Sequence, residues 1–296
     1  MKHLPTVIQS ARPPFLLLAL VCVFLGIATA NTANSINAWH AILAALGAVL
    51  AHVSVNAFNE YFDYKSGLDH ITEKNPFSGG SGGLVANPHA LSWVLITAIT
   101  SLALCIFIGT YFWLTVGPAI IPIGITGIVV ILLYTSVFNK YPWVCWVSPG
   151  IGFGWLITLG TNVVLGGHIS EFAFLVSCLP LLLCNNLLLL NQFPDIKADQ
   201  TIGRKTLPIA KGTQFSLHLF GLTLIATCGL IVYIYTNFHL HPFILTTYLP
   251  VFVGLGIYKK LFEAQKDNAK LIPLMGGNVA ITLITPVLFS IGILLS

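Results

Sequence analysis

The sequence predicts an all-α membrane protein with nine transmembrane helices, and three observations lead to this prediction. Of the 296 residues, 56% are hydrophobic and only 7% are charged, whereas a soluble domain carries roughly 25% charged residues. Apolar runs long enough to cross a bilayer recur along the whole chain. No linker or low-complexity tract interrupts them, so we expect residues 1–296 to form a single transmembrane domain.

Each predicted span is a run of about 20 mainly apolar residues, the length that crosses a bilayer as a helix. The first span begins shortly after Arg12, and the second ends where polar residues become frequent at Asn59. Short breaks separate the third span from the fourth and the seventh from the eighth. In chain order, the predicted spans are 14–30, 38–58, 89–109, 114–134, 147–166, 171–190, 214–236, 241–258 and 271–294.

Positive charge divides the loops into two groups. The four loops after odd-numbered spans contain no Lys or Arg, so all thirteen basic residues fall on one side of the predicted bundle. Because positive charge is retained in the cytoplasm, we predict a multi-pass protein of the cell inner membrane with its N-terminus cytoplasmic and its C-terminus external. The net charge of +4 then reports orientation and indicates no nucleic-acid partner. The loops without basic residues are 31–37, 110–113, 167–170 and 237–240.

The acidic residues are few and clustered. Six of the nine lie in two short stretches, each after an apolar span on the predicted cytoplasmic side. Each stretch opens with Asn, places Asp four residues later and adds another Asp within six. The first stretch contains Asn59, Asp63 and Asp69, and the second contains Asn191, Asp195 and Asp199.

Helical spacing places the polar residues of the first stretch on one face. His52, Asn56, Asn59 and Asp63 follow one another at three or four residues, so their side chains share a stripe. Asp69 falls outside this spacing, and we expect Gly67 to let the chain turn before it. In the second stretch, the proline at position 194 should kink or end the sixth helix close to its acids.

Carboxylates near lipid are expensive, so a chain that clusters its few acids is expected to use them. Paired carboxylates offer the hard oxygen ligands that suit Mg²⁺, and Mg²⁺ in turn suits a phosphate-bearing substrate. Because both acidic stretches fall on the same predicted side, we predict that the ends of the second and sixth spans converge on shared metal ions. The alternative is that these residues are solvated helix ends. Basic residues beside the acids are candidates to meet the remaining phosphate charge: Lys65, Lys74, Lys140, Lys197, Arg204 and Lys205.

Residues 75–83 form a glycine- and serine-rich segment between the first acids and the third span. Glycine lets backbone amides approach a ligand closely, and a run of such amides can bind an anion. We therefore weigh a phosphate-facing lid against a simple flexible loop for this segment.

These motifs resemble the two signatures of the intramembrane UbiA-type prenyltransferases. The resemblance rests on Asn59-x₃-Asp63-x₅-Asp69 followed by glycines, and on Asn191-x₃-Asp195-x₃-Asp199 followed by Gly203-Arg204-Lys205. Leu133-Tyr134-Thr135, with Lys140 shortly after, is similar to the family's Tyr/Lys loop. The first motif looks closest to the branch that prenylates dihydroxynaphthoate in menaquinone synthesis. Two departures are Glu60, where many members have Asp, and Lys74 in place of the usual Arg.

The resemblance implies a Mg²⁺-dependent enzyme with a central cavity open to the cytoplasmic face. It would move a polyprenyl group from an isoprenyl diphosphate to an aromatic acceptor and release diphosphate. The implied catalytic and metal-binding residues are Asp63, Asp69, Asp195 and Asp199. The implied substrate-binding residues are Asn59, Lys65, Lys74, Tyr134, Lys140, Asn191, Arg204 and Lys205. Aromatic candidates for shielding the allylic cation are Tyr61, Phe62, Tyr64, Tyr134 and Phe193, with plain packing as the alternative.

Two other functions remain open at this point. The same chemistry would serve another acceptor, such as 4-hydroxybenzoate, haem or a glycerophosphate lipid. In a different class, a membrane transporter with an acidic gate would also contain clustered acids, although such acids usually lie near the middle of the bilayer.

Overall fold

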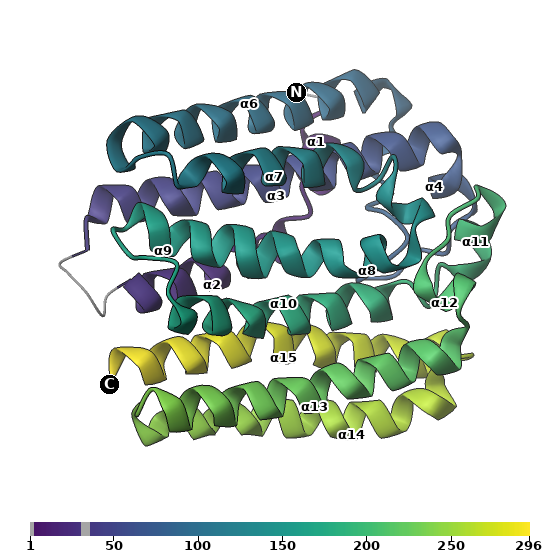
Figure 1. Ribbon diagram of the computed structural model, residues 1–296. Helices are drawn as coiled ribbons and strands as arrows, with labels where there is room; N and C mark the ends of the chain where they lie inside the picture. The colour runs from purple at the N-terminus through teal and green to yellow at the C-terminus, as the bar shows by residue number, and fades with distance from the viewer. Residues whose placement is uncertain (1–2, 31–35) are drawn as a thin grey trace.

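The computed structural model describes residues 3–30 and 36–296, and all regular structure in these two ranges is helical. The long helices run side by side in one bundle (Figure 1). The all-α prediction is therefore confirmed. Eight helical segments in the described ranges are long and apolar enough to cross a membrane. They are α2 (Pro13–Ala30), α3 (Ala38–Ser66), Pro88–Val116, Pro142–Val164, α10 (Glu171–Asn191), α13 (Thr213–Asn237), Pro242–Ala264 and α15 (Asn268–Leu294).

Three of these segments are composite. Pro88–Val116 joins η1 (Pro88–Ala90) to α6 (Leu91–Val116), and Pro242–Ala264 joins η4 (Pro242–Thr247) to α14 (Tyr248–Ala264). Pro142–Val164 consists of α8 (Pro142–Gly150), the π-helical η3 (Ile151–Leu159) and α9 (Gly160–Val164).

The fourth predicted span corresponds to α7 (Ile120–Leu133), which is apolar but has only 14 residues. At 1.5 Å per residue it is about 21 Å long, against a hydrocarbon core of about 30 Å. The helix nevertheless carries the chain back from the far end of α6 to the end where α4 and α11 lie (Figure 1).

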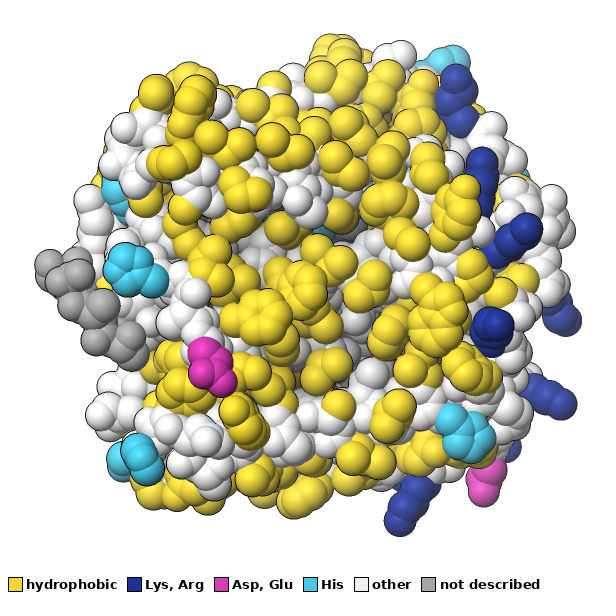
Figure 2. Space-filling view, in the orientation of Figure 1, with side chains coloured by type: hydrophobic (Ala, Val, Ile, Leu, Met, Phe, Trp, Pro, Cys, Tyr) yellow, Lys and Arg dark blue, Asp and Glu magenta, His cyan; other side chains and the backbone are white. Residues whose placement is uncertain are grey.

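Short helices are concentrated at that end of the bundle. They include α4 (Leu68–Ile71), α5 (Gly83–Ala86), η2 (Phe138–Lys140), α11 (Ile196–Thr201) and α12 (Leu207–Ala210). A further short helix, α1 (Leu4–Ser10), packs against α3, α5 and α6. Lys and Arg side chains gather along the same end, and apolar side chains cover the face between the two ends (Figure 2). The C-terminus lies at the opposite end (Figure 1).

Several predicted boundaries differ from those of the helices, and two of the differences have identifiable reasons. The second span was predicted to end at residue 58, but α3 continues to Ser66 because its polar residues face the protein interior. Gly67, with φ of 80°, then ends the helix, and the predicted turn is confirmed. Residues 110–113 were predicted to form a loop, yet α6 continues to Val116, because residues 110–116 contain neither glycine nor proline, and the helix ends only at Gly117. The predicted loop 31–37 falls mostly outside the described residues.

Helix α10 lies at the centre of the packing, against α2, α8, η3, α13 and α15. Two neighbouring asparagines connect it to other helices inside the apolar core. The Asn185 side-chain oxygen accepts a hydrogen bond from the Gly150 amide at 2.8 Å, and the Asn186 amide donates to the Phe220 carbonyl at 3.0 Å. These buried bonds fix how α10 sits against α8 and α13. They also position the end of α10, which carries the second acidic stretch.

Candidate active site

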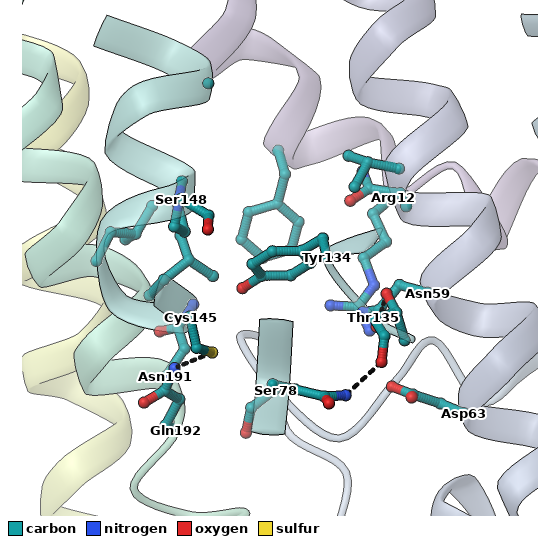
Figure 3. Close-up of a pocket in the computed structure, with 18 of the residues that line it drawn as sticks. Arg12, Asn59, Asp63, Ser78, Tyr134, Thr135, Cys145, Ser148, Asn191 and Gln192 are labelled. Carbon is teal, nitrogen blue, oxygen red and sulfur yellow. Dashed lines mark hydrogen bonds between the residues drawn. The ribbon is translucent and has the colours of Figure 1, made fainter. Parts of the chain in front are cut away.

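A cavity of about 280 Å³ lies between α2, α3, α7, α8, η3 and α10. Loop 75–83, α4 and α11 contribute its polar end. Side chains from the ends of several helices point into this space (Figure 3). Of the residues predicted to bind metal or substrate, the cavity is lined by Asn59, Asp63, Asp69, Tyr134, Asn191, Asp195, Asp199 and Arg204.

The two acidic stretches meet at this end of the cavity. Arg204 forms an ion pair with Asp63 at the end of α3, and its other terminal nitrogen lies 3.0 Å from Oδ1 of Asp199 on α11. Both carboxylates and the guanidinium are largely buried. The prediction that the ends of the second and sixth spans converge is therefore confirmed.

Loop 75–83 contacts both acidic stretches. The Ser78 hydroxyl and the Gly79 amide lie close to Asp195 and favour its ionised form by lowering its pKa. Gly80 lies against Asp69, since a Cβ at this glycine would come within 2.6 Å of Asp69 Oδ1. Gly79, Gly80 and Gly82 all have positive φ, a conformation that favours glycine. The glycine-rich sequence therefore lets the loop fold tightly onto the acids.

Several buried oxygens around these contacts have no hydrogen-bond partner. They are Oδ2 of Asp69, Oδ1 of Asp195 and the side-chain oxygen of Asn191. Carboxylate and amide oxygens of this kind suit Mg²⁺. Within residues 3–30 and 36–296, no three His, Cys, Asp or Glu side chains are grouped closely enough to hold a metal alone. The donor set therefore fits Mg²⁺ that also takes oxygens from phosphate or water, as is usual for this ion.

Burial perturbs the acids outside the long helices. Desolvation, helped by the charges of Glu60 and Asp63, raises the pKa of Asp69 to about 7. Desolvation and the charge of Asp199 raise the pKa of Asp195 to about 7, against the opposing hydrogen bonds from loop 75–83. Burial also raises the pKa of Asp199, while Arg204 opposes the rise. A cation beside these acids would therefore offset the electrostatic cost of ionising them.

Sequence reasoning missed the role of Glu60 and Arg12. Glu60 is 1% exposed. Its Oε1 accepts hydrogen bonds from Arg12 at 3.0 and 3.1 Å and from the Ser81 amide at 2.7 Å, and its Oε2 accepts one from the Ser81 hydroxyl at 2.8 Å. The residue thus ties α3 to loop 75–83 and to the junction of α1 and α2. A glutamate directly after an apolar span indicates a buried basic partner. The sequence alone does not show which Lys or Arg residue that partner is.

The structure does not bring most of the predicted lysines into the cavity. Lys65, Lys140 and Lys205 are exposed and do not line it. Lys65 instead lies over the ring of Tyr61 at 5.6 Å. Lys74 is also exposed, but its charge opposes the rise in the Asp69 pKa, which places it near the acids. These long side chains extend into solvent at the basic end, where charge remains hydrated.

Among the predicted aromatic residues, only Tyr134 lines the cavity. Tyr61, Phe62 and Tyr64 pack in the cluster between α3 and α6, and Phe193 belongs to the core around α10 and α13. These four residues therefore contribute to packing between helices and do not line the cavity. Three aromatic residues that sequence reasoning did not select line the cavity instead, namely Phe15, Phe77 and Phe153.

The deeper part of the cavity is apolar with a few polar groups. His52 is 7% exposed, its Nδ1 has no hydrogen-bond partner, and its ring meets Phe153 edge-on with centroids 4.9 Å apart. Ser148 and Gln192 line the same space. A largely apolar cavity with few polar groups is typical of a site for a hydrophobic substrate.

Fold and site together define a polytopic α-helical membrane protein with an acidic, arginine-bridged cavity at one end. Residues 19–277 match the UbiA prenyltransferase family. The chain belongs to this family and is a membrane prenyltransferase. The enzyme prediction is therefore confirmed, and the transporter alternative is not supported.

Known relatives and structures agree with this assignment. The chain is 27% identical to a 1,4-dihydroxy-2-naphthoate octaprenyltransferase of Haemophilus influenzae, covering 97% of this chain and 95% of that protein. It is 24% identical to a digeranylgeranylglyceryl phosphate synthase of Methanobrevibacter smithii, covering 88% of each.

Among solved structures, a UbiA homologue from Aeropyrum pernix matches with a TM-score of 0.73 at 16% identity, covering 95% of this chain and 97% of that one. A homologue from Archaeoglobus fulgidus bound to DMAPP and Mg²⁺ matches with a TM-score of 0.66 at 15% identity, covering 97% and 99%. At these identities the likeness shows the shared fold.

Proposed function

We propose that the protein transfers a polyprenyl group from an isoprenyl diphosphate to an aromatic acceptor in the synthesis of a menaquinone-type quinone, with Mg²⁺ as cofactor. One observation carries the donor half of this proposal. Asp63 and Asp199, from two distant stretches, share Arg204, and unpartnered oxygens of Asp69 and Asp195 line the same cavity. Such a site suits a magnesium–diphosphate group.

The residues of the chain have distinct tasks in this reaction. Asp63, Asp69, Asp195 and Asp199 would hold Mg²⁺, and Asn191 would add a neutral oxygen ligand. Mg²⁺ supplies positive charge where negative charge develops on diphosphate as the allylic C–O bond breaks.

Arg204 now neutralises two carboxylates, and its guanidinium is placed to bind a phosphate oxygen when diphosphate enters. Thr135 donates to the Asn59 side-chain oxygen at 3.1 Å, which leaves the amide of Asn59 to donate toward the same site.

The remaining residues protect the reacting carbon. Tyr134 and Phe77 line the cavity near the acids, and aromatic faces stabilise a nearby cation. The apolar walls formed by α7 and η3 exclude water, which would otherwise capture the allylic cation. The acceptor carbon then bonds to the prenyl group and loses a proton, which a carboxylate or solvent takes up.

An aromatic acceptor is favoured over a glycerophosphate lipid. The Haemophilus relative covers nearly the whole of both chains, and its name assigns 1,4-dihydroxy-2-naphthoate as acceptor. The cavity also offers flat aromatic and aliphatic walls with Ser148 and Gln192 as polar contacts. A glycerophosphate acceptor is the second candidate, because the Methanobrevibacter relative is a digeranylgeranylglyceryl phosphate synthase.

We also propose that the chain crosses the inner membrane nine times, with α7 as the short crossing. The C-terminus lies at the end opposite the basic side chains (Figures 1 and 2), as an odd number of crossings requires for a cytoplasmic N-terminus. The basic end, with the opening of the cavity, then faces the cytoplasm.

The deciding assay uses purified protein in lipid nanodiscs with Mg²⁺ and a labelled prenyl diphosphate. It offers 1,4-dihydroxy-2-naphthoate, 4-hydroxybenzoate and geranylgeranylglyceryl phosphate as separate acceptors. We expect prenylated naphthoate and free diphosphate. Product only with the glycerophosphate would select the second candidate, and no product with any acceptor would contradict the aromatic proposal.

A further inference from the structure

The polar stripe along α3 contains one residue whose task is still open. Asn56, Asn59 and Asp63 each make a hydrogen bond or an ion pair with another element. The fourth residue, His52, is 7% exposed, and its Nδ1 has no hydrogen-bond partner among the described residues. Its side chain lines the candidate active site. A buried polar group without a partner is costly, and a ligand that pairs with the same ring would offset that cost.

The surroundings of the His52 ring assign its proton. A neutral imidazole carries one proton, on either Nδ1 or Nε2. A proton on Nδ1 would be a buried donor without an acceptor, and such donors are rarer in proteins than acceptors left without a donor. The proton therefore belongs on Nε2. Because Nδ1 is enclosed while the side chain lines the cavity, the cavity meets the outer edge of the ring, which carries Nε2.

The orientation of the imidazole is set by the π-helical segment η3. Phe153 of η3 meets the ring edge-on, with centroids 4.9 Å apart and an angle of 74° between the planes. The Thr158 hydroxyl lies 3.1 Å from the Phe153 carbonyl and 3.3 Å from the Cys22 carbonyl on α2. A Cβ at Gly154 would lie 2.6 Å from the Ser177 carbonyl oxygen, so the backbone of η3 directly contacts α10. These contacts hold Phe153, and with it the imidazole, in a defined position.

The distance between His52 and the acids suits a flat acceptor. Positions 52 and 63 are three helical turns apart on one face of α3, which is about 16 Å at 1.5 Å per residue. A metal-bound diphosphate at the acids covers only part of this distance. The acceptor carbon must lie about 3–3.5 Å from the reacting prenyl carbon, so the remaining space accommodates an aromatic ring. An oxygen at the far edge of that ring would then meet the imidazole.

We propose that His52 donates a hydrogen bond from Nε2 to a ring hydroxyl oxygen of the aromatic acceptor and so selects acceptors of the hydroquinone type. This inference rests on the proposed function. In 1,4-dihydroxy-2-naphthoate, the 1-hydroxyl is bonded to the neighbouring carboxylate, so the 4-hydroxyl is the one available to the histidine. An acceptor without that oxygen leaves the imidazole unpaired, and a site built to bond a hydroxyl discriminates against such a ligand.

The kinetic test compares His52→Leu, which removes the donor, with His52→Gln, whose side-chain amide is still a donor. We expect His52→Leu to raise KM for the acceptor about tenfold and to leave KM for the prenyl diphosphate unchanged, with part of the loss recovered in His52→Gln. His218→Leu is the matched control, because His218 is an exposed histidine of α13 that does not line the site. A histidine that served only packing would change both KM values together.

A second measurement identifies the oxygen that His52 binds. The dissociation constants of 1,4-dihydroxy-2-naphthoate and of 1-hydroxy-2-naphthoate, which lacks the 4-hydroxyl, are measured with Mg²⁺ and inorganic diphosphate present, so that no transfer occurs. We expect wild-type protein to bind the dihydroxy compound about tenfold more tightly, and His52→Leu to bind both about equally.

Three results would overturn the proposal. They are an unchanged acceptor KM in His52→Leu, parallel changes in both KM values, and equal discrimination between the two naphthoates by wild type and His52→Leu. Failure of wild-type protein to prenylate 1,4-dihydroxy-2-naphthoate would instead contradict the proposed function, and the binding measurement would still test the assignment of His52.

Discussion

Arg204 binds Asp63 across 141 positions of the sequence, and its second terminal nitrogen binds Asp199 five positions before it. This single guanidinium joins the two acidic stretches at the polar end of the cavity. The arrangement explains how buried carboxylates of like charge are held together before substrate arrives, since leaving them unpaired would be costly. It also gives the site an arginine that a phosphate group can recruit.

Removing this arginine should impair both binding and chemistry. We expect Arg204→Ala to lower kcat/KM by about 100-fold, because one charged donor to the leaving group is lost. Arg204→Lys should recover only part of the activity, because an ammonium cannot bridge both carboxylates. Steady-state kinetics on both variants test this, with Lys211→Ala as the exposed control. Full activity in Arg204→Lys would show that the fork geometry is unimportant.

Loss of an acid should remove the response to metal. We expect Asp63→Ala and Asp195→Ala to fold and insert but to lose turnover. They should also lose the rise in melting temperature that Mg²⁺ and a prenyl diphosphate together produce, because bound ligand stabilises only the folded state. Asp267→Asn, at an exposed pair with Lys270, serves as the control. Retained activity in both alanine variants would remove the metal–diphosphate hypothesis.

The pKa values of Asp69 and Asp195 are both raised to about 7. They predict opposite effects of pH on the stability of the protein without Mg²⁺ and on its affinity for Mg²⁺. The folded metal-free protein binds more protons than the unfolded chain between the ordinary and raised pKa values. Its stability should therefore fall as pH rises from about 4 to about 7 and change little above that. Mg²⁺ requires the deprotonated acids, so its affinity should rise over the same interval. Melting curves with and without Mg²⁺ measure both trends, and parallel trends would contradict the assignment.

The buried carboxylate of Glu60 should be important for stability. We expect Glu60→Ala to lower the free energy of unfolding by about 3 kcal/mol, because it leaves Arg12 without its buried partner. Loop 75–83 should become more accessible to protease, since Ser81 also loses its acceptor. Glu60→Gln, which keeps the shape, should cost less. Thermal unfolding and limited proteolysis measure these effects, with Glu263→Ala as a surface control.

Membrane topology provides an independent test. A reporter fused after Ser296 should be external, because nine crossings place the two ends of the chain on opposite sides of the membrane. A reporter placed after Lys140 should be cytoplasmic. A cytoplasmic C-terminus would show that α7 does not cross the membrane.

The sequence was sufficient to predict the helical class, the end of α3 at Gly67 and the meeting of the two Asn-x₃-Asp stretches. Apolar length and helical spacing are local properties, so they can be read directly from the chain. Local polarity was also the source of the errors. Because polar residues become frequent at Asn59, the second span was predicted to end at residue 58, although α3 continues to Ser66. The lysines beside the acids suggested ligands, although Lys65, Lys140 and Lys205 extend into solvent.

Other features were decided only by the tertiary structure. The sequence contains Glu60, Arg12 and Ser81 at distant positions, and only packing of α1, α3 and loop 75–83 brings them into one hydrogen-bonded group. Likewise, Gly124 and Gly154 look alike in the sequence, yet a Cβ at Gly124 would meet nothing within 4 Å and one at Gly154 would lie 2.6 Å from the Ser177 carbonyl oxygen. The difference lies in which neighbour faces each missing Cβ, and that neighbour comes from another helix.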